Sequence, residues 1–255
     1  MDFTTVDGLL WLMGVLLPFI FLQRRLHFEL QAVLLLLLRR QEVALGLFSF
    51  LFLPGVLLHE ASHYVAATLL GVRTGRFSLL PRLMPGGKLQ LGYVETEQTD
   101  FFRDAVIGAA PLITGGLAIA FIGLDRLGLL PLVNAVAAGN ANAFWATLGS
   151  LPSRPDFWLW FYLAFAVSTT MLPSPSDRRG WLPLGLTIGG LVALALLAGA
   201  GPWMLSNLAP LLNRGMRALA AVFGVSLAIH LVLVVPLRFL RGALSKLTGL
   251  SVLAD

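Results

Sequence analysis

The residues with the clearest chemical potential are two histidines and a glutamate in one short stretch, His59, Glu60 and His63. On a helix, residues four apart lie on the same face, so both imidazoles point the same way, while the glutamate lies on the adjacent flank. This is the HExxH arrangement, in which the histidines bind zinc and the glutamate activates a water molecule. The spacing therefore predicts a metal site on a helix.

The position of Glu60 within a long apolar segment supports a functional role. The sixteen residues from Val43 to Leu58 carry no charge, which places Glu60 inside a bilayer or just at its edge. An acidic side chain at the centre of a membrane helix costs about 2.5–3.5 kcal/mol on insertion scales, so such a residue is a functional-site hypothesis by default.

A third ligand for the metal has to come from elsewhere in the chain, because a catalytic zinc usually takes three protein ligands. The chain has no cysteine, which leaves His27, His230, a carboxylate or an amide. Asp177 is the preferred candidate, because it follows two prolines that cannot continue a regular helix, so the chain can turn back toward the site. The same segment equally fits an ordinary polar turn at the membrane surface.

The composition indicates a multi-pass protein of the cell membrane. Hydrophobic residues make up 57% of the 255 residues and charged residues only 12%, and the mean hydropathy is +0.84. The formal net charge is +5, but the basic residues lie mostly in short groups between apolar runs, as expected for membrane flanks rather than a nucleic-acid partner. The absence of cysteine excludes disulfides and thiol redox chemistry.

The apolar runs predict an all-α polytopic membrane fold with about six transmembrane helices, each needing about 20 apolar residues. The segment Leu26–Leu38 is short and flanked by arginine pairs, so we interpret it as an interfacial helix rather than a span. The expected spans are centred on Leu9–Leu22, Val43–Leu70, Ala105–Leu124, Phe157–Leu172, Leu182–Ala200 and Ala218–Leu240.

The chain divides into three predicted parts, with an unusual loop in the second. Residues 1–42 hold the first span and the interfacial segment, residues 43–181 form a catalytic core, and residues 182–255 add two spans and a short tail. Between Gly71 and Phe102 the alternation from Lys88 to Val94 and the turn residues Pro85-Gly86-Gly87 predict a β-hairpin-like loop after the metal helix.

Beyond HExxH, four segments resemble motifs of the site-2 protease family of intramembrane zinc metalloproteases. The matches keep their order within Val43–Trp181, somewhat over half of the chain. The segments, with the family patterns that they resemble, are Gly71–Ser78 (G-V-x-V-x-x-F-S), Leu91–Val94 (G-G-Y-V), Ala109–Gly115 (A-G-P-x-x-N) and Thr170–Gly180 (N-x-x-P-x-P-x-x-D-G).

The resemblance implies a ligand set and a reaction. By it, His59, His63 and Asp177 hold zinc, Glu60 deprotonates the attacking water, and the substrate is a membrane protein with a transmembrane segment. It also implies a set of substrate-binding residues, Thr170, Thr114, Gly92 and Tyr93.

The chain departs from the family patterns at several positions. Ala110 replaces a glycine, Thr114 and Thr170 replace asparagines, and the interval from Pro175 to Asp177 is one residue shorter than in the family. Threonine still donates a hydrogen bond, so contacts to the substrate can persist in altered form.

Two other functions fit the same residues. Histidines and acids inside a membrane also mark ion pathways, so a metal transporter or sensor is an alternative, in which Glu60 is a ligand rather than a base. A pseudoprotease that binds membrane proteins without cutting them is another. The strand-like segment Lys88–Val94 either pairs with an extended substrate or only packs over the helices.

Overall fold

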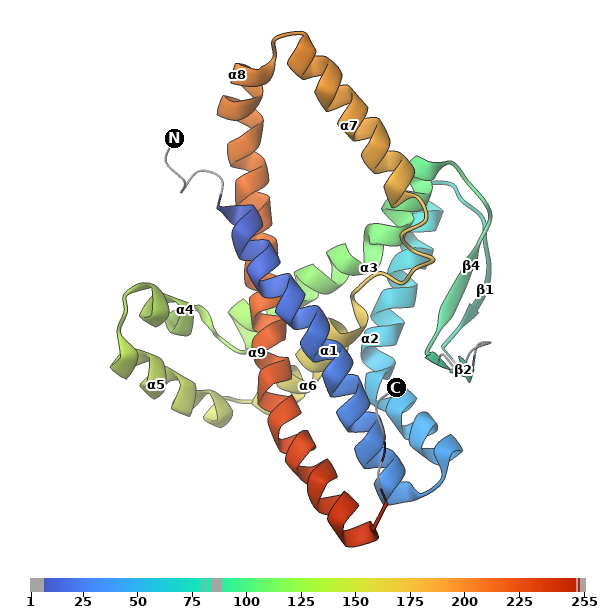
Figure 1. Ribbon diagram of the computed structural model, residues 1–255, viewed down its shortest axis with the longest axis vertical. Helices are drawn as coiled ribbons and strands as arrows, with labels where there is room; N and C mark the ends of the chain where they lie inside the picture. Colours follow the sequence, from blue (N-terminus) through green and yellow to red (C-terminus); the bar gives the residue numbers. More distant parts are fainter. Residues whose placement is uncertain (1–6, 80, 84–88, 251, 253–255) are drawn as a thin grey trace.

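The computed structural model describes residues 7–79, 81–83, 89–250 and 252, which form a set of packed helices with paired short strands at one side (Figure 1). The elements are α1 (Gly8–Leu38), α2 (Gln41–Leu69), β1 (Thr74–Ser78), β2 (Arg82–Leu83), β3 (Leu89–Gln90), β4 (Tyr93–Thr96), α3 (Phe101–Phe121), α4 (Leu130–Ala137), α5 (Ala141–Ser150), α6 (Phe157–Thr170), α7 (Trp181–Leu197), α8 (Gly201–Trp203) and α9 (Ala209–Thr248), with short π-helical turns after α3 and before α9 and a 3₁₀ turn after α5.

By length and composition, four helices in the described residues are long and apolar enough to cross a membrane, which is fewer than the six spans predicted. They are Gly8–Leu38, Gln41–Leu69, Phe101–Arg126 and Gly201–Thr248. The other two predicted spans correspond to α6 and α7, which have 14 and 17 residues, short of the roughly 20 that a span needs. Both helices are shorter than predicted, because the chain leaves the helix before Pro173 and because α7 stops just before Gly199, which has a φ of +84°.

The segment Leu26–Leu38 was predicted to be a separate interfacial helix, and this prediction was wrong. The segment is the second half of the 31-residue helix α1. Figure 1 shows α1 running diagonally along α9. Leu26 and Leu30 are buried in the hydrophobic core. The segment therefore continues the helix into the protein interior.

Charged residues in and beside this segment are paired inside the bundle. Glu29 is fully buried, and its carboxylate accepts from Arg25 at 2.8 Å on the same helix and from Arg241 of α9. Two arginines thus compensate one buried carboxylate. The interfacial interpretation failed because Arg241 lies 212 residues away in the sequence.

Removing both arginines is expected to destabilise the fold strongly. The double variant Arg25→Met, Arg241→Met leaves Glu29 as an uncompensated buried charge, which typically costs about 3–5 kcal/mol. Adding Glu29→Met should restore most of the free energy of unfolding, since an apolar replacement of a buried ion pair is often neutral. Denaturant unfolding of the three proteins in detergent micelles measures this. Equal stability of wild type and double variant would contradict the role given to Glu29.

The predicted hairpin-like loop is present as nested antiparallel strands beside α2 (Figure 1). Strand β1 pairs with β4, with Phe77 opposite Val94, and β2 pairs with β3. The predicted turn Pro85-Gly86-Gly87 and Lys88 lie outside the described residues.

Aromatic contacts hold α2 and α6 together and join the two ends of the chain. Phe52 of α2 meets Phe165 of α6 with ring centroids 5.2 Å apart, and Phe19 of α1 meets Phe223 of α9 at 5.6 Å. The first contact sets the helix that carries HExxH against the helix that precedes Asp177. The second joins helices from the first and third predicted parts, whose boundaries at residues 42 and 181 stay a prediction.

Candidate metal centre

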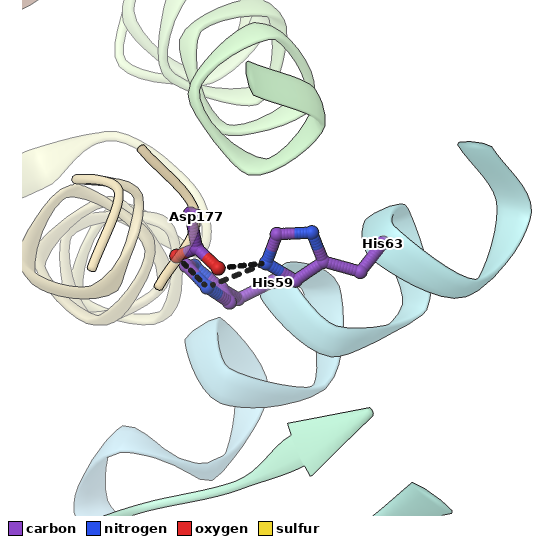
Figure 2. A group of neighbouring side chains, drawn as sticks. All are labelled: His59, His63 and Asp177. Carbon is purple, nitrogen blue, oxygen red and sulfur yellow. Dashed lines mark hydrogen bonds and ion pairs between the residues drawn. The ribbon is translucent and has the colours of Figure 1, made fainter. Parts of the chain in front are cut away.

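Helix α2 carries His59 and His63, and both side chains point toward Asp177, which lies in the loop between α6 and α7 (Figure 2). Their ligand atoms all lie within 4.8 Å of one another. Of the candidates for the third ligand, the structure therefore brings Asp177 to the pair. In the described residues, neither His27 nor His230 belongs to this cluster.

Each histidine is oriented by a backbone carbonyl. His59 Nδ1 is 2.7 Å from the carbonyl oxygen of Thr170, and His63 Nδ1 is 2.9 Å from that of Ile107. Because a carbonyl oxygen only accepts, each Nδ1 carries the hydrogen and each neutral ring turns the lone pair of Nε2 to the other side. Both histidines are thus set as ligands through Nε2.

The three facing groups are all electron-pair donors. The two Nε2 atoms are 3.2 Å apart, and the Asp177 oxygens lie 3.7 Å from His59 Nε2 and 3.3 Å from His63 Nε2. Lone pairs at these distances repel unless a proton or a metal ion lies among them. Two imidazoles and one carboxylate form a suitable donor set for a transition-metal ion, and they leave a coordination position open. A metal ion therefore fits this cluster.

Asp177 is held in place by its own loop. The carboxylate Oδ2 accepts a hydrogen bond of 2.7 Å from the backbone N–H of Ser174. Burial acts to raise the pKa of Asp177, but in the metal-free protein hydrogen bonds from protonated imidazole Nε2 atoms and from the Ser174 N–H outweigh it, so the pKa lies well below its ordinary value. The side chain is therefore an ionised carboxylate, the form that binds metal.

Two glycines allow the backbone segments around the metal ligands to pack closely against each other. A Cβ on Gly55 of α2 would collide with Ala166 and Thr170 of α6, and one on Gly108 of α3 would collide with the backbone carbonyl of Asp177. Gly55 thus lets the Thr170 carbonyl reach His59, and Gly108 lets the Asp177 loop lie against α3.

Gly108→Ala is expected to weaken metal binding at least tenfold without touching a ligand side chain. The added methyl group has to displace the Asp177 backbone, and residues that orient metal ligands typically contribute 10- to 100-fold in affinity. Gly116→Ala on the same helix is the matched control, since its Cβ meets only Val222 at 3.9 Å. Zinc titration against a competing chelator gives both affinities. Equal affinities for the two variants would show that the approach at Gly108 does not matter.

The cluster opens onto a cavity of about 660 Å³ that also contains Glu60. Glu60 is 7% exposed, and its carboxylate interacts with the backbone N–H of Val94 in β4. The sheet therefore lies against the flank of α2 on which the predicted base is located. Because it is buried beside the cluster of His59, His63 and Asp177, this carboxylate is placed to exchange protons with a water molecule in the cavity.

The four predicted substrate-binding residues differ in their placement. Gly92, Tyr93 and Thr170 line the cavity, whereas Thr114 is not among its described lining residues. The Thr114 hydroxyl donates to the carbonyl of Ala110 within α3. The Thr170 hydroxyl likewise donates within its own helix, to the carbonyl of Ala166, so the contribution of Thr170 to the centre is its carbonyl to His59.

His230, the other histidine considered as a ligand, is satisfied elsewhere. It is fully buried, with Nε2 3.2 Å from the Thr169 hydroxyl and Nδ1 donating to the Ser226 carbonyl at 2.8 Å. Both ring nitrogens are thus hydrogen-bonded, Nδ1 within α9 and Nε2 across to α6.

Sequence reasoning missed the residues that act through their backbone. Ile107 contributes its carbonyl group, and Gly108 leaves room because it has no side chain. Neither residue type indicates a metal site.

Comparison of the chain with protein-family models, with curated proteins and with solved structures finds no match.

Proposed function

We propose that this protein is an intramembrane zinc metalloprotease of the site-2 protease type, which hydrolyses peptide bonds in or near transmembrane segments of membrane proteins. One observation carries the proposal. The two histidines of HExxH, the distant Asp177 and the glutamate next to His59 all border one cavity, in a chain with long apolar helices.

Zinc is the metal that we assign to this donor set. His59, His63 and Asp177 would hold it through two nitrogens and one oxygen, and the chain has no thiol to offer. When bound, zinc supplies a Lewis acid that lowers the pKa of water and polarises a carbonyl group.

The membrane location is part of the proposal. We place the protein in the cell membrane as a multi-pass protein, with the shorter helices α6 and α7 entering the bilayer beside the four long ones. The exposed surface of α7 supports this, since it has no buried residue and presents large apolar side chains, among them Leu182 and Leu186. Such a surface requires lipid or another apolar partner.

In the proposed reaction, Glu60 moves the proton. It takes a proton from the attacking water as the water oxygen bonds to the carbonyl carbon of the substrate, and it returns the proton to the amine as the carbon–nitrogen bond breaks. The substrate has to present extended backbone, and β4 with Gly92 and Tyr93 lines the cavity where it would lie. Polar groups of the loop after α6, such as Ser174, also line the cavity and offer water a route.

Co-expression with a panel of single-span membrane proteins tests the function. Wild type should shorten at least one member within its transmembrane region, and the matched His59→Ala, His63→Ala variant should shorten none. Cleavage of the same proteins by that variant would refute the proposal, and metal-dependent ion flux in vesicles without any cleavage would favour a transporter.

A further inference from the structure

A histidine outside the HExxH motif borders the same cavity. His27 lies on α1, in the part of the chain predicted to precede the catalytic core, and lines the cavity together with His59 and Thr170. It does not belong to the metal cluster. Helix α1 therefore contributes a polar side chain to the wall of the proposed active site.

His27 is unusual because one of its ring nitrogens has no partner. In the described part of the chain, His27 Nε2 is the only buried side-chain nitrogen or oxygen atom without a hydrogen bond. The ring packs against Phe48 and Phe52, with centroids 5.6 and 5.5 Å away, and neither phenyl group accepts or donates a conventional hydrogen bond. Such an atom costs about 1–3 kcal/mol if it stays unpaired, so it calls for a partner. The cavity that the His27 side chain borders is the space from which a partner would come.

His230, a fully buried histidine outside the metal-ligand cluster, shows what a structural role looks like in this protein. His230 has both ring nitrogens hydrogen-bonded, to Thr169 and Ser226. His27 instead combines an unpaired nitrogen, apolar neighbours and a position on the cavity wall. A leucine in its place would pack against the same phenyl rings without the cost of the unpaired atom.

We propose that His27 binds the polypeptide backbone of the substrate in this cavity. A neutral imidazole carries one donor and one acceptor, as does each peptide unit of an extended chain. Strand β4 lines the same cavity with Tyr93 and Val94, so an extended segment bound in the cavity would meet β4 as well as His27. This proposal rests on the proposed proteolytic function and extends the substrate site to α1.

Two metal-directed probes separate backbone binding from metal binding. Acetohydroxamate chelates zinc and has no peptide extension, whereas an apolar tripeptide hydroxamate adds backbone amides that reach along the cavity. The full-length zinc-loaded protein and its variants would be titrated with both probes in nanodiscs. His27→Leu should weaken the tripeptide probe about tenfold, equivalent to about 1.4 kcal/mol, and leave acetohydroxamate unchanged. His27→Gln should recover part of the loss.

Zinc content and melting temperature complete the test. His27→Leu should keep full zinc and melt no lower than wild type, while the control His230→Leu should melt lower because it loses two hydrogen bonds. An unchanged affinity for the tripeptide probe, an equal loss for both probes, or a lower melting temperature of His27→Leu would each overturn the role of His27. Failure of the wild type to hold zinc or acetohydroxamate would overturn the proposed function itself, and this inference with it.

Discussion

Alanine at His59, His63 or Asp177 is expected to strip the protein of zinc, whereas alanine at His230 leaves it bound. The three cluster residues supply every protein ligand in the arrangement described above, so each loss leaves an incomplete set. The expected fall in affinity exceeds the 10- to 100-fold that is typical for residues that only orient ligands. Elemental analysis of purified protein after dialysis against a weak chelator measures zinc per chain, with about one expected for wild type.

His230→Ala is the matched control for Asp177→Ala, because both remove a mostly buried polar side chain near the end of α6. Zinc retained by Asp177→Ala and lost by His230→Ala would move the third ligand to α9. Full occupancy in the double variant His59→Ala, His63→Ala would remove the site altogether.

Glu60→Gln is expected to fold, hold zinc and bind membrane substrates, yet leave them uncut. Glutamine keeps the size of the side chain and can still hydrogen-bond, but it lacks the basic carboxylate that takes the proton from water. A loss of general-base catalysis costs typically 10²- to 10⁴-fold in rate. The rate constant of cleavage and the zinc content would be measured on the same preparation.

The outcomes for Glu60→Gln separate the candidate functions. Loss of zinc would make Glu60 a ligand, as a transport site requires, and would count against proteolysis. Unchanged cleavage would remove Glu60 from the mechanism and leave the reaction without its base.

The sequence predicted the ligand side chains of the centre better than the backbone groups that hold them in place. His59 and His63 follow from helical periodicity alone, because their spacing puts them on one face wherever the helix lies. Asp177 lies more than a hundred residues further along, and the residues by themselves left its role open. The Ile107 carbonyl and the space over Gly108 could not be predicted, since they depend on how α3 packs and not on a residue type.

The errors in the predicted fold have a similar origin. The short segment between arginine pairs suggested a separate interfacial helix, but the pairing of Glu29 with Arg25 and with Arg241 on a distant helix makes burial possible. The lengths of α6 and α7 were overestimated because apolar composition continues past the residues at which each helix ends. A hydropathy pattern indicates neither an ion pair between distant residues nor the residue at which a helix ends.

The central claim is that this centre hydrolyses a peptide bond, and the isotopic content of a product tests it most directly. Purified zinc-loaded protein would be incubated with a reconstituted single-span substrate in water enriched in oxygen-18. Hydrolysis predicts a new carboxyl terminus in or near the transmembrane segment, carrying one oxygen-18 atom, and no such product from Glu60→Gln. A fully zinc-loaded wild type that yields no labelled terminus from any substrate it binds would contradict the claim.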